Sequence, residues 1–302
     1  MNTGSETGVA SNGHDRGPVD GRNGDGGGHN GARPRAREPV GVAVEPSPVP
    51  SPVAPCGRVS VVIPAKNEAK NLAWVLLRMP PYVSEVILVD GESTDGTVAI
   101  ATAALPDITI VKDPGRGKGA ALRAGFAAAT GDCIVMLDAD GSMDPAEMTR
   151  FLAVLATGFE LVKGSRFIAG GDSTDITGLR RFGNRVLRST VNVLYRTRFS
   201  DLCYGYCAFR RSALPALGLR ADGFEIETEI SLHAVAAGLR VCEVPSFEAP
   251  RGHGTTSLRT FRDGERVLRT VVCERLRPRP PGRKIRRPDQ TDPTVPLVPA
   301  GY

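Results

Sequence analysis

Short apolar runs alternate with amphipathic segments through the middle of the chain. The run V-S-V-V-I-P at 59–64 is rich in β-branched residues and predicts a buried strand, whereas apolar residues at helical spacing predict a helix. By these two criteria we expect strands at 59–64, 86–90, 108–111 and 133–137, and helices at 68–79, 97–104 and 120–129. Strands that alternate with helices form right-handed βαβ units, so this part of the chain predicts a mainly parallel sheet flanked by helices.

The alternation is less regular after residue 140. We expect helices at 145–155, 180–198, 225–237 and 259–277, and strands at 161–163, 203–210 and 240–244. The helices at 180–198 and 259–277 are basic and amphipathic. Together the elements predict one α/β domain over residues 58–276, built on a mainly parallel central sheet.

The two ends of the chain differ from the middle in composition. Residues 1–57 are rich in Gly and Pro, show neither helical nor strand periodicity and lack an apolar signal-peptide core, so we expect a disordered head and no secretory signal. Residues 277–302 form a Pro- and Arg-rich tail that we also expect to be disordered. Of the 302 residues, 41% are hydrophobic, which is enough for a sizeable core between these ends.

The net charge and the cysteine content limit which partners and which cellular compartment we expect for the protein. A net charge of +5 suits anionic substrates or anionic lipid, whereas an aromatic content of only 5% argues against nucleic acid. Six scattered cysteines without a C-x-x-C pair predict reduced thiols, and neither disulfides nor a zinc site. No run approaches the ~18 apolar residues that a spanning helix needs. We therefore expect a cytoplasmic protein that is soluble or peripheral on the inner face of the membrane.

Two carboxylates directly follow the predicted strand at 133–137. Asp138 and Asp140 are two positions apart, so both side chains can face one site if the chain stays extended. Like charges this close favour a cation between them, and carboxylate oxygens suit Mg²⁺ or Mn²⁺ that also holds a diphosphate. The alternative is an ordinary Asx turn, because D-x-D is common in loops.

Polar residues follow the other predicted strands in the same way. Asp90, Lys118 and Asp138 all lie just beyond strand ends, where parallel sheets bind their ligands. Asp90 can accept hydrogen bonds from a ribose or a base, and Lys118 between two glycines can approach phosphates, although the spacing is not that of a P-loop. In the turn after Asp90, Asp95 or Ser93 could cap the next helix; we expect Asp95 to be structural and Asp90 to face the ligand, with Ser93 also a candidate for binding the nucleotide.

The second half of the domain offers further cations. Candidates for contacts with an anion are Arg166, Arg180, Arg181 and Arg251. Arg180 and Arg181 follow a Gly-, Asp- and Thr-rich loop and are candidates for a mobile clamp, although a lone arginine is usually a solvated surface residue. His253 between two glycines is either a metal ligand, a phosphate contact or an exposed loop residue.

Carboxylates in the second half are candidates for acid/base chemistry. Asp201 is one of them. Glu225, Glu227 and Glu229 form a second group at the start of a predicted helix, where favourable interaction with the helix dipole is the structural alternative and accounts for Glu225. Glu225 and Glu229 share a helix face, so one of them can reach the site, and Glu229 is the candidate catalytic residue.

These motifs together resemble the family 2 glycosyltransferases with the GT-A fold. The resemblance is carried by V-S-V-V-I-P-A-K-N-E (59–68), V-D-G-E-S-T-D-G-T (89–97), G-K-G-A-A-L-R-A-G-F (117–126), L-D-A-D-G (137–141), G-S-R-F (164–167), G-Y-C-A-F-R (205–210) and R-G-H-G-T-T-S (251–257). It covers nearly all of residues 58–275. The most similar subgroup is that of the polyprenyl-phosphate sugar synthases, typified by dolichyl-phosphate mannose synthase.

The resemblance implies a GT-A domain with a Rossmann-like nucleotide-sugar half at 58–142 and an acceptor half at 143–276. It places Pro64, Asn67, Glu68 and Asp90 around the nucleotide, and Asp138 and Asp140 on Mg²⁺ or Mn²⁺, with Asp140 also in a catalytic role. It implies inverting transfer of a hexose from a UDP- or GDP-linked donor to a polyprenyl phosphate in glycolipid or cell-envelope biosynthesis.

Three features depart from the subgroup. Gly91 stands where a second acidic residue usually follows the strand-end Asp. Ser142 stands where a Gln often ligates the metal, so water or His253 would complete the metal shell. The C-terminal transmembrane helices of many relatives are absent, which leaves peripheral contact through the basic helix at 259–277 or simple packing of that helix on the domain.

Alternatives to this function depend on the acceptor and on the reaction. A phosphate acceptor needs orientation by Arg180 and Arg181, whereas a hydroxyl acceptor needs Asp201 or Glu229 as a general base. Nucleotidyl transfer would require a Gly-rich basic loop after the first strand, where this chain has P-A-K-N-E at 64–68. A non-catalytic module that binds sugar nucleotides is the remaining alternative.

Overall fold

The computed structural model describes residues 56–254, 260–277 and 289–290. Residues 1–55 of the predicted head and nearly all of the predicted tail lie outside these residues and remain predictions, as does the placement of Thr255, Thr256 and Ser257. None of the helices in the described ranges has the length and apolar character that crossing a bilayer requires.

The first half of the domain follows the predicted alternation of strands and helices. In chain order it contains β1 (Val59–Ala65), α1 (Ala69–Leu77), β2 (Val83–Asp90), α2 (Thr97–Ala104), β3 (Thr109–Lys112), α3 (Lys118–Ala128) and β4 (Cys133–Met136). Strands β1, β2, β3 and β4 pair in parallel, so their carboxyl ends lie at one edge of the sheet.

The second half adds longer helices and several short elements that the pattern did not predict. It contains η1 (Pro145–Glu147), α4 (Met148–Ala156), β5 (Leu161–Ser165), β6 (Asp172–Ser173), α5 (Gly178–Tyr195), β7 (Cys207–Arg210), η2 (Arg211–Ala213), α6 (Leu214–Leu217), α7 (Ile226–Ala236), β8 (Val241–Pro245), β9 (Phe247–Glu248), α8 (Thr260–Leu276) and β10 (Asp289–Gln290). Helix α5 begins before the predicted Arg180 because the Thr177 hydroxyl caps it, accepting from the Arg180 N–H at 3.3 Å.

Most of the described strands form one mixed sheet. The described strands follow the order β10-β8-β5-β7-β4-β1-β2-β3, and β7 alone runs antiparallel to both of its neighbours. A separate two-stranded sheet pairs β6 with β9. The prediction of a mainly parallel central sheet is confirmed.

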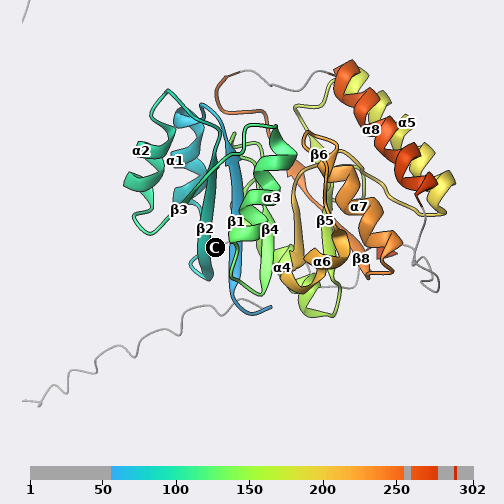
Figure 1. Cartoon of the computed structure of the whole chain (residues 1–302), viewed down its shortest axis with the longest axis horizontal. Helices are drawn as coiled ribbons and strands as arrows, with labels where there is room; N and C mark the ends of the chain where they lie inside the picture. The colour runs from blue at the N-terminus through green and yellow to red at the C-terminus, as the bar shows by residue number, and fades with distance from the viewer. Residues whose placement is uncertain (1–55, 255–259, 278–288, 291–302) are drawn as a thin grey trace, which may run out of the picture. The chain divides into compact units, whose positions relative to one another are not determined.

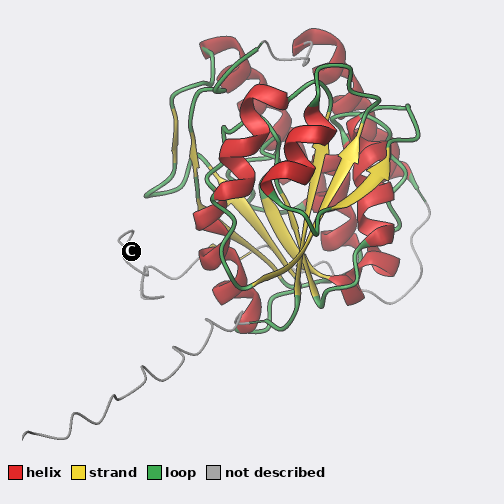
Figure 2. Cartoon of the chain, turned by 90° about the vertical axis from the view of Figure 1, so that its left-hand side faces the viewer, coloured by secondary structure: helices red, strands yellow, loops and turns green. Residues whose placement is uncertain are grey.

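Helices cover both faces of this sheet (Figure 2). Successive residues of β1 point to opposite faces: Val61 packs in a cluster with Leu72 of α1 and Phe151 of α4, whereas Val62 packs with Leu122 of α3 and Ile230 of α7. Helix α8 packs on α7 and α5, on the same side of the sheet as α7 (Figure 1).

The cysteine prediction is wrong for one pair. The structure joins Cys56 to Cys133 as a disulfide, with Cα atoms 6.6 Å apart. The two residues are 77 positions apart in sequence, and they meet because the start of β4 pairs with the start of β1 at Val59. The other four cysteines carry thiol groups and take no part in this disulfide.

Candidate active site

The predicted strand-end residues meet at the carboxyl edge of the sheet. Asp90 is the last residue of β2 and pairs in register with Ala65 at the end of β1. Asp138 follows β4, whose continuation is held to β1 by the Leu137 N–H donating to the Val62 carbonyl at 3.2 Å. The parallel arrangement therefore brings together side chains that are far apart in sequence.

Lys118 holds two carboxylates from distant segments. Its Nζ lies 2.7 Å from Asp138 Oδ1 and 2.8 Å from Glu227 Oε1. All three side chains are largely buried, with exposed fractions of 13%, 24% and 8% for Lys118, Asp138 and Glu227. Gly205 lies against this cluster, because a Cβ there would be 2.9 Å from Glu227 Oε1 and 3.2 Å from Lys118 Nζ.

The charges in this cluster shift one another's protonation. Burial raises the pKa of Asp138 to about 6 despite the opposing effect of the Lys118 ammonium, and the negative charges of Asp140 and Glu227 add to the rise. Burial by itself would lower the pKa of Lys118, but the Asp138 and Glu227 carboxylates outweigh it and raise that pKa. The lysine therefore stays protonated and balances part of the negative charge of the carboxylates.

Asp140 takes part in a second ion-pair group beside the first. Arg251 Nη2 lies 3.0 Å from Asp140 Oδ2, and Arg251 Nη1 lies 2.6 Å from Glu68 Oε1. Ser142 donates its N–H and its hydroxyl to Asp140 Oδ1, at 3.0 and 2.7 Å. Burial opposes the charge of Arg251, but hydrogen bonding to Glu68 and the charges of Asp140 and Glu68 raise its pKa.

The loops after β1 and β2 form a hydrogen-bonded unit next to these groups. The Asn67 N–H donates to Ser93 Oγ at 2.9 Å, and the Ser93 N–H donates to Asp90 Oδ2 at 3.3 Å. The other carboxylate oxygen of Asp90, Oδ1, is buried without a hydrogen-bond partner among the described residues. Such an acceptor is costly unless a ligand donates to it. Asp95 accepts from the Thr97 N–H at 3.1 Å and so has the predicted structural role at the start of α2, whose N-cap residue is Gly96.

Asp201 lies in a different environment from the one predicted. Its carboxylate is fully buried and accepts from Arg166 Nε at 2.7 Å and from Arg166 Nη2 at 3.0 Å. Arg166 Nη1 also reaches Glu248 Oε2 at 2.9 Å. Asp201 and Arg166 therefore form a buried ion pair with each other. The described contacts join neither residue to Lys118, Asp138 or Glu227.

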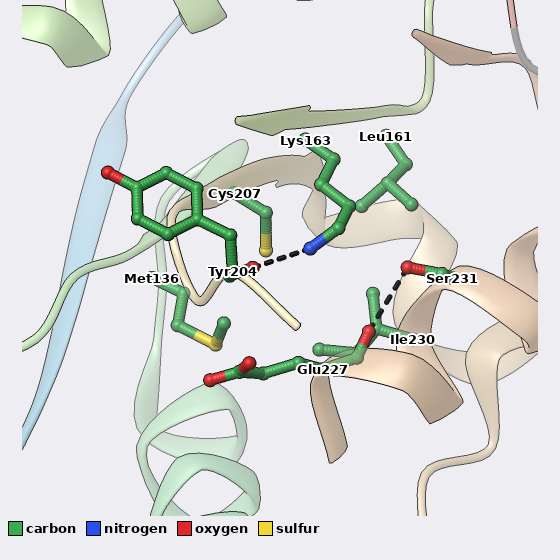
Figure 3. A pocket seen from close by; sticks show the side chains of 8 residues that line it. All are labelled: Met136, Leu161, Lys163, Tyr204, Cys207, Glu227, Ile230 and Ser231. Carbon is green, nitrogen blue, oxygen red and sulfur yellow. Dashed lines mark hydrogen bonds between the residues drawn. The ribbon is translucent and has the colours of Figure 1, made fainter. Parts of the chain in front are cut away.

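The acidic group at the start of α7 contributes a residue other than the predicted one. Glu229 is buried and accepts from the Arg220 and Ala221 N–H groups at 2.9 and 2.8 Å, so it fixes a loop. Glu225 pairs with Arg266 at 2.9 Å. Glu227 is the one that reaches Lys118. In Figure 3 the Glu227 side chain lines one side of a small pocket, and Lys163, which lines another side, donates to the Tyr204 carbonyl.

The remaining candidates lie around this edge. Pro64 is part of β1 and pairs in register with Val89. His253 is exposed, and its carbonyl accepts from Asn71 Nδ2 at 3.0 Å. Arg180 lies 3.5 Å from Asp175. Arg181 is exposed, with its guanidinium 5.7 Å from the centre of the Phe167 ring. The described contacts join neither arginine to Asp138 or Asp140.

The donor set at this edge fits a hard divalent cation. Asp138 and Asp140 supply carboxylate oxygens, and the Ser142 hydroxyl adjoins them. Each carboxylate is already paired with a cationic side chain, Lys118 or Arg251, which shows that the site favours positive charge.

Comparison with known proteins places this site in a family. The family model described as glycosyl transferase family 2 matches residues 60–218. The chain belongs to this family. This family 2 glycosyltransferase is 34% identical over 222 residues to glycosyltransferase AglJ of Haloferax volcanii. The match covers 72% of this chain and 70% of that relative.

Two further relatives of this glycosyltransferase are named for lipid phosphates. It is 31% identical over 227 residues to the polyprenol monophosphomannose synthase of Mycolicibacterium smegmatis, covering 69% of this chain and 84% of the relative. It is 30% identical over 226 residues to the undecaprenyl-phosphate mannosyltransferase of Micrococcus luteus, covering 70% and 91%. The resemblance to the polyprenyl-phosphate sugar synthases is confirmed.

A solved structure shares the fold. Glucosyl-3-phosphoglycerate synthase from Mycobacterium tuberculosis, in complex with Mn²⁺, uridine diphosphate and phosphoglyceric acid, matches this glycosyltransferase with a TM-score of 0.59 and 23% identity. The match covers 74% of this chain and 80% of that one. It confirms the GT-A fold.

Proposed function

We propose that this family 2 glycosyltransferase moves a hexose, with inversion, from a UDP- or GDP-linked donor to a polyprenyl phosphate, with Mg²⁺ or Mn²⁺ bound. The observation that carries the proposal is the interleaving of two carboxylates with two cations: Asp138 pairs with Lys118, and Asp140 pairs with Arg251. With a diphosphate and a divalent ion bound, Asp138 and Asp140 would hold the ion, and Lys118 and Arg251 would pair with the phosphates.

The nucleoside end of the donor fits the loops after β1 and β2. The unpartnered Asp90 Oδ1 can accept from a ribose hydroxyl or a base N–H. Asn67 and Ser93 hold the shape of that pocket through their mutual hydrogen bond, and Glu68 orients Arg251. These four residues therefore bind or position the nucleoside diphosphate.

Asp138 and Asp140 would hold the divalent ion, with Ser142, water or His253 as further ligands. Such an ion supplies charge stabilisation for the departing nucleoside diphosphate. Lys118 and Arg251 add positive charge at the same phosphates. Glu227, brought close by Lys118, is our candidate for a carboxylate that contacts the sugar.

A phosphate acceptor agrees with this arrangement. A phosphate monoester is largely anionic near neutral pH, since its second pKa is about 6, so it attacks the anomeric carbon without a general base. That removes the need for Asp201 and Glu229, which the structure uses for internal contacts. Support for a polyprenyl chain comes from the two relatives named for polyprenol and undecaprenyl phosphate.

The test is release of UDP or GDP from a panel of sugar nucleotides with Mn²⁺, with and without a polyprenyl phosphate. We expect one donor to be used, release to rise with the lipid, and Asp138→Asn and Asp140→Asn each to lower turnover about a hundredfold or more. Asp107→Asn, an exposed carboxylate between α2 and β3, is the matched control and should retain full turnover.

Other outcomes identify the alternatives. Turnover that ignores the lipid but rises with a hydroxyl acceptor would make Glu227 the general base and refute the phosphate acceptor. Release of pyrophosphate from a nucleoside triphosphate would indicate nucleotidyl transfer. Tight binding of a sugar nucleotide without metal-dependent turnover of any donor would leave only the binding module.

A further inference from the structure

Helices α5 and α8 form a paired outer layer of the acceptor half (Figure 1). The Tyr195 hydroxyl donates to the Val271 carbonyl at 2.8 Å, and Arg275 Nε donates to the Leu194 carbonyl at 3.1 Å. Val191 and Tyr195 of α5 and Val271 of α8 are fully buried. The inner faces of both helices are therefore fixed to the domain and to each other.

The outer face of α5 carries a stripe of exposed apolar side chains. The stripe consists of Leu179, Phe182, Val186 and Val193, spaced i, i+3, i+7 and i+14. Residues at this spacing share one helix face. Phe182 is 65% exposed and Val193 is 77% exposed, whereas Asn184 and Val191 on the opposite face are buried.

Helix α8 repeats the arrangement. Its exposed stripe consists of Phe261, Leu268, Val272 and Leu276, spaced i, i+7, i+11 and i+15. Phe261 is 80% exposed and Leu276 is 79% exposed, while Val267 is buried. The sequence left open whether the α8 stripe packs on the domain or meets a membrane. The structure shows that one set of apolar residues packs inward and a second set remains outside.

The charged residues beside the stripes indicate which kind of partner this apolar surface binds. Residues 178–200 contain six arginines and no carboxylate, and Arg181 and Arg185 are exposed beside the α5 stripe. On α8, exposed Arg262 and Arg269 lie beside the stripe, and one exposed acid, Glu265, lies within it, one turn after Phe261. A second copy of the chain would place arginines against arginines, whereas an anionic lipid surface complements them.

We propose that the exposed stripes of α5 and α8, with their flanking arginines, dock the enzyme on an anionic lipid bilayer. Apolar side chains enter the boundary between headgroups and acyl chains, and arginines pair with lipid phosphates, as in other interfacial helices. The role of this docking surface rests on the proposed function, since it would bring the enzyme to a membrane-embedded acceptor. Vesicle binding itself requires no catalysis.

The test is flotation of the full-length chain with phosphatidylcholine vesicles, with and without phosphatidylglycerol. We expect binding to the anionic vesicles, little binding to the neutral ones and a steep loss with added salt. Phe182→Ser with Val193→Ser, and Phe261→Ser with Leu276→Ser, should each weaken binding about tenfold or more while the thermal midpoint stays unchanged. Leu77→Ser is the matched control, because this α1 side chain is 74% exposed and lies outside both stripes.

A charge variant separates docking from chemistry. Arg185→Gln with Arg269→Gln should weaken binding to anionic vesicles and flatten its salt dependence. The same variant should leave turnover with a short, water-soluble polyprenyl phosphate unchanged.

Equal binding to neutral vesicles, no vesicle binding, or binding that the stripe variants leave intact would overturn the docking surface. So would a stable dimer that the stripe variants dissociate. Vesicle binding without sugar transfer would support the docking surface and refute the proposed function. Transfer to a soluble acceptor without vesicle binding would support the proposed glycosyl transfer and refute the docking surface.

Discussion

At the scale of single residues, the site is organised by one buried lysine. Lys118 opens α3 and joins Asp138, which follows β4, to Glu227 on α7. Asp138, Asp140 and Glu227 together carry three negative charges at one edge of the sheet, so the cation that separates them also keeps the ligand-free site together.

Replacing this lysine tests that role. Lys118→Met is expected to lower the free energy of unfolding by about 3 kcal/mol, because Asp138 and Glu227 would be left buried without their cation. Added Mn²⁺ should restore part of that loss, and it should stabilise the variant more than the wild type. Denaturant unfolding with and without Mn²⁺ measures both effects. Equal stabilisation of the two proteins by Mn²⁺ would contradict the shared site.

Gly205 tests how closely the cluster is packed. Gly205→Ala places a methyl group 2.9 Å from Glu227 Oε1, so the side chains must shift while the backbone stays in place. We expect turnover to fall about tenfold with little change in thermal midpoint. Gly264→Ala on α8 is the control, since a Cβ there would meet no atom within 4 Å. Full activity of Gly205→Ala would show that the cluster tolerates displacement.

At the scale of elements, buried ion pairs connect segments that are far apart in the sequence. Arg166 follows β5, Asp201 precedes β7, and Glu248 belongs to β9. Asp201 also receives the Cys203 N–H at 3.3 Å. This network fixes the path of the chain between α5 and β7, and thereby sets where Gly205 meets Lys118.

The network predicts a separation of stability from catalysis. Asp201→Asn should lower the free energy of unfolding by about 3 to 5 kcal/mol, because Arg166 loses its buried counter-charge. Turnover per folded molecule should change by less than about threefold, whereas Glu227→Gln should lower it about tenfold or more. Thermal midpoints and turnover normalised to folded protein distinguish the two variants. A catalytic base at Asp201 would give the opposite result.

Glu243 of β8 provides the pH dependence of this region. It is fully buried, it accepts from the Ser200 and Asp201 N–H groups at 2.8 and 3.1 Å, and burial raises its pKa from 4.5 to about 7. A raised folded-state pKa contributes stability that is fully present below pH 4.5 and is lost as the pH rises through about 7.

The wild type should therefore lose up to about 3 kcal/mol between about pH 5 and pH 8 relative to Glu243→Gln, which lacks the ionisable group. Urea unfolding of both proteins across this range measures the difference. Parallel pH profiles for the two proteins would show that Glu243 does not titrate there.

The predictable and unpredictable parts of the site differ in their physical basis. Asp90, Lys118 and Asp138 could be predicted because each follows a continuous apolar strand, and parallel strands end at one edge. Glu227 could not be chosen over Glu229, because residues 226–232 of α7 are buried on every side and leave no periodicity to mark a face.

Contacts between distant segments were equally hidden in the sequence. Arg166 and Asp201 are 35 residues apart, and no local pattern distinguishes a buried arginine that holds a carboxylate from one that holds a phosphate. Likewise, β6 and β9 contain only two residues each, which is too short for a periodic pattern to predict a strand.

At the scale of the whole molecule, the parts of the domain before and after residue 142 share one sheet. Residues 58–142 supply β1 to β4, and β7 from the later half lies directly against β4, with Cys133 opposite Arg210 and Met136 opposite Cys207. Strand β7 also joins β5. The edge of the first part of the domain, at β4, is therefore covered by a strand of the second part.

This placement of β7 limits how such enzymes can diversify. Exchanging the acceptor half between relatives, by recombination or by design, would also exchange the strand that covers β4. An ill-matched replacement would leave the backbone of β4 open to pairing between molecules. A change of acceptor is therefore easier to evolve by altering loops and outer helices around a retained β7 than by shuffling whole segments at residue 142.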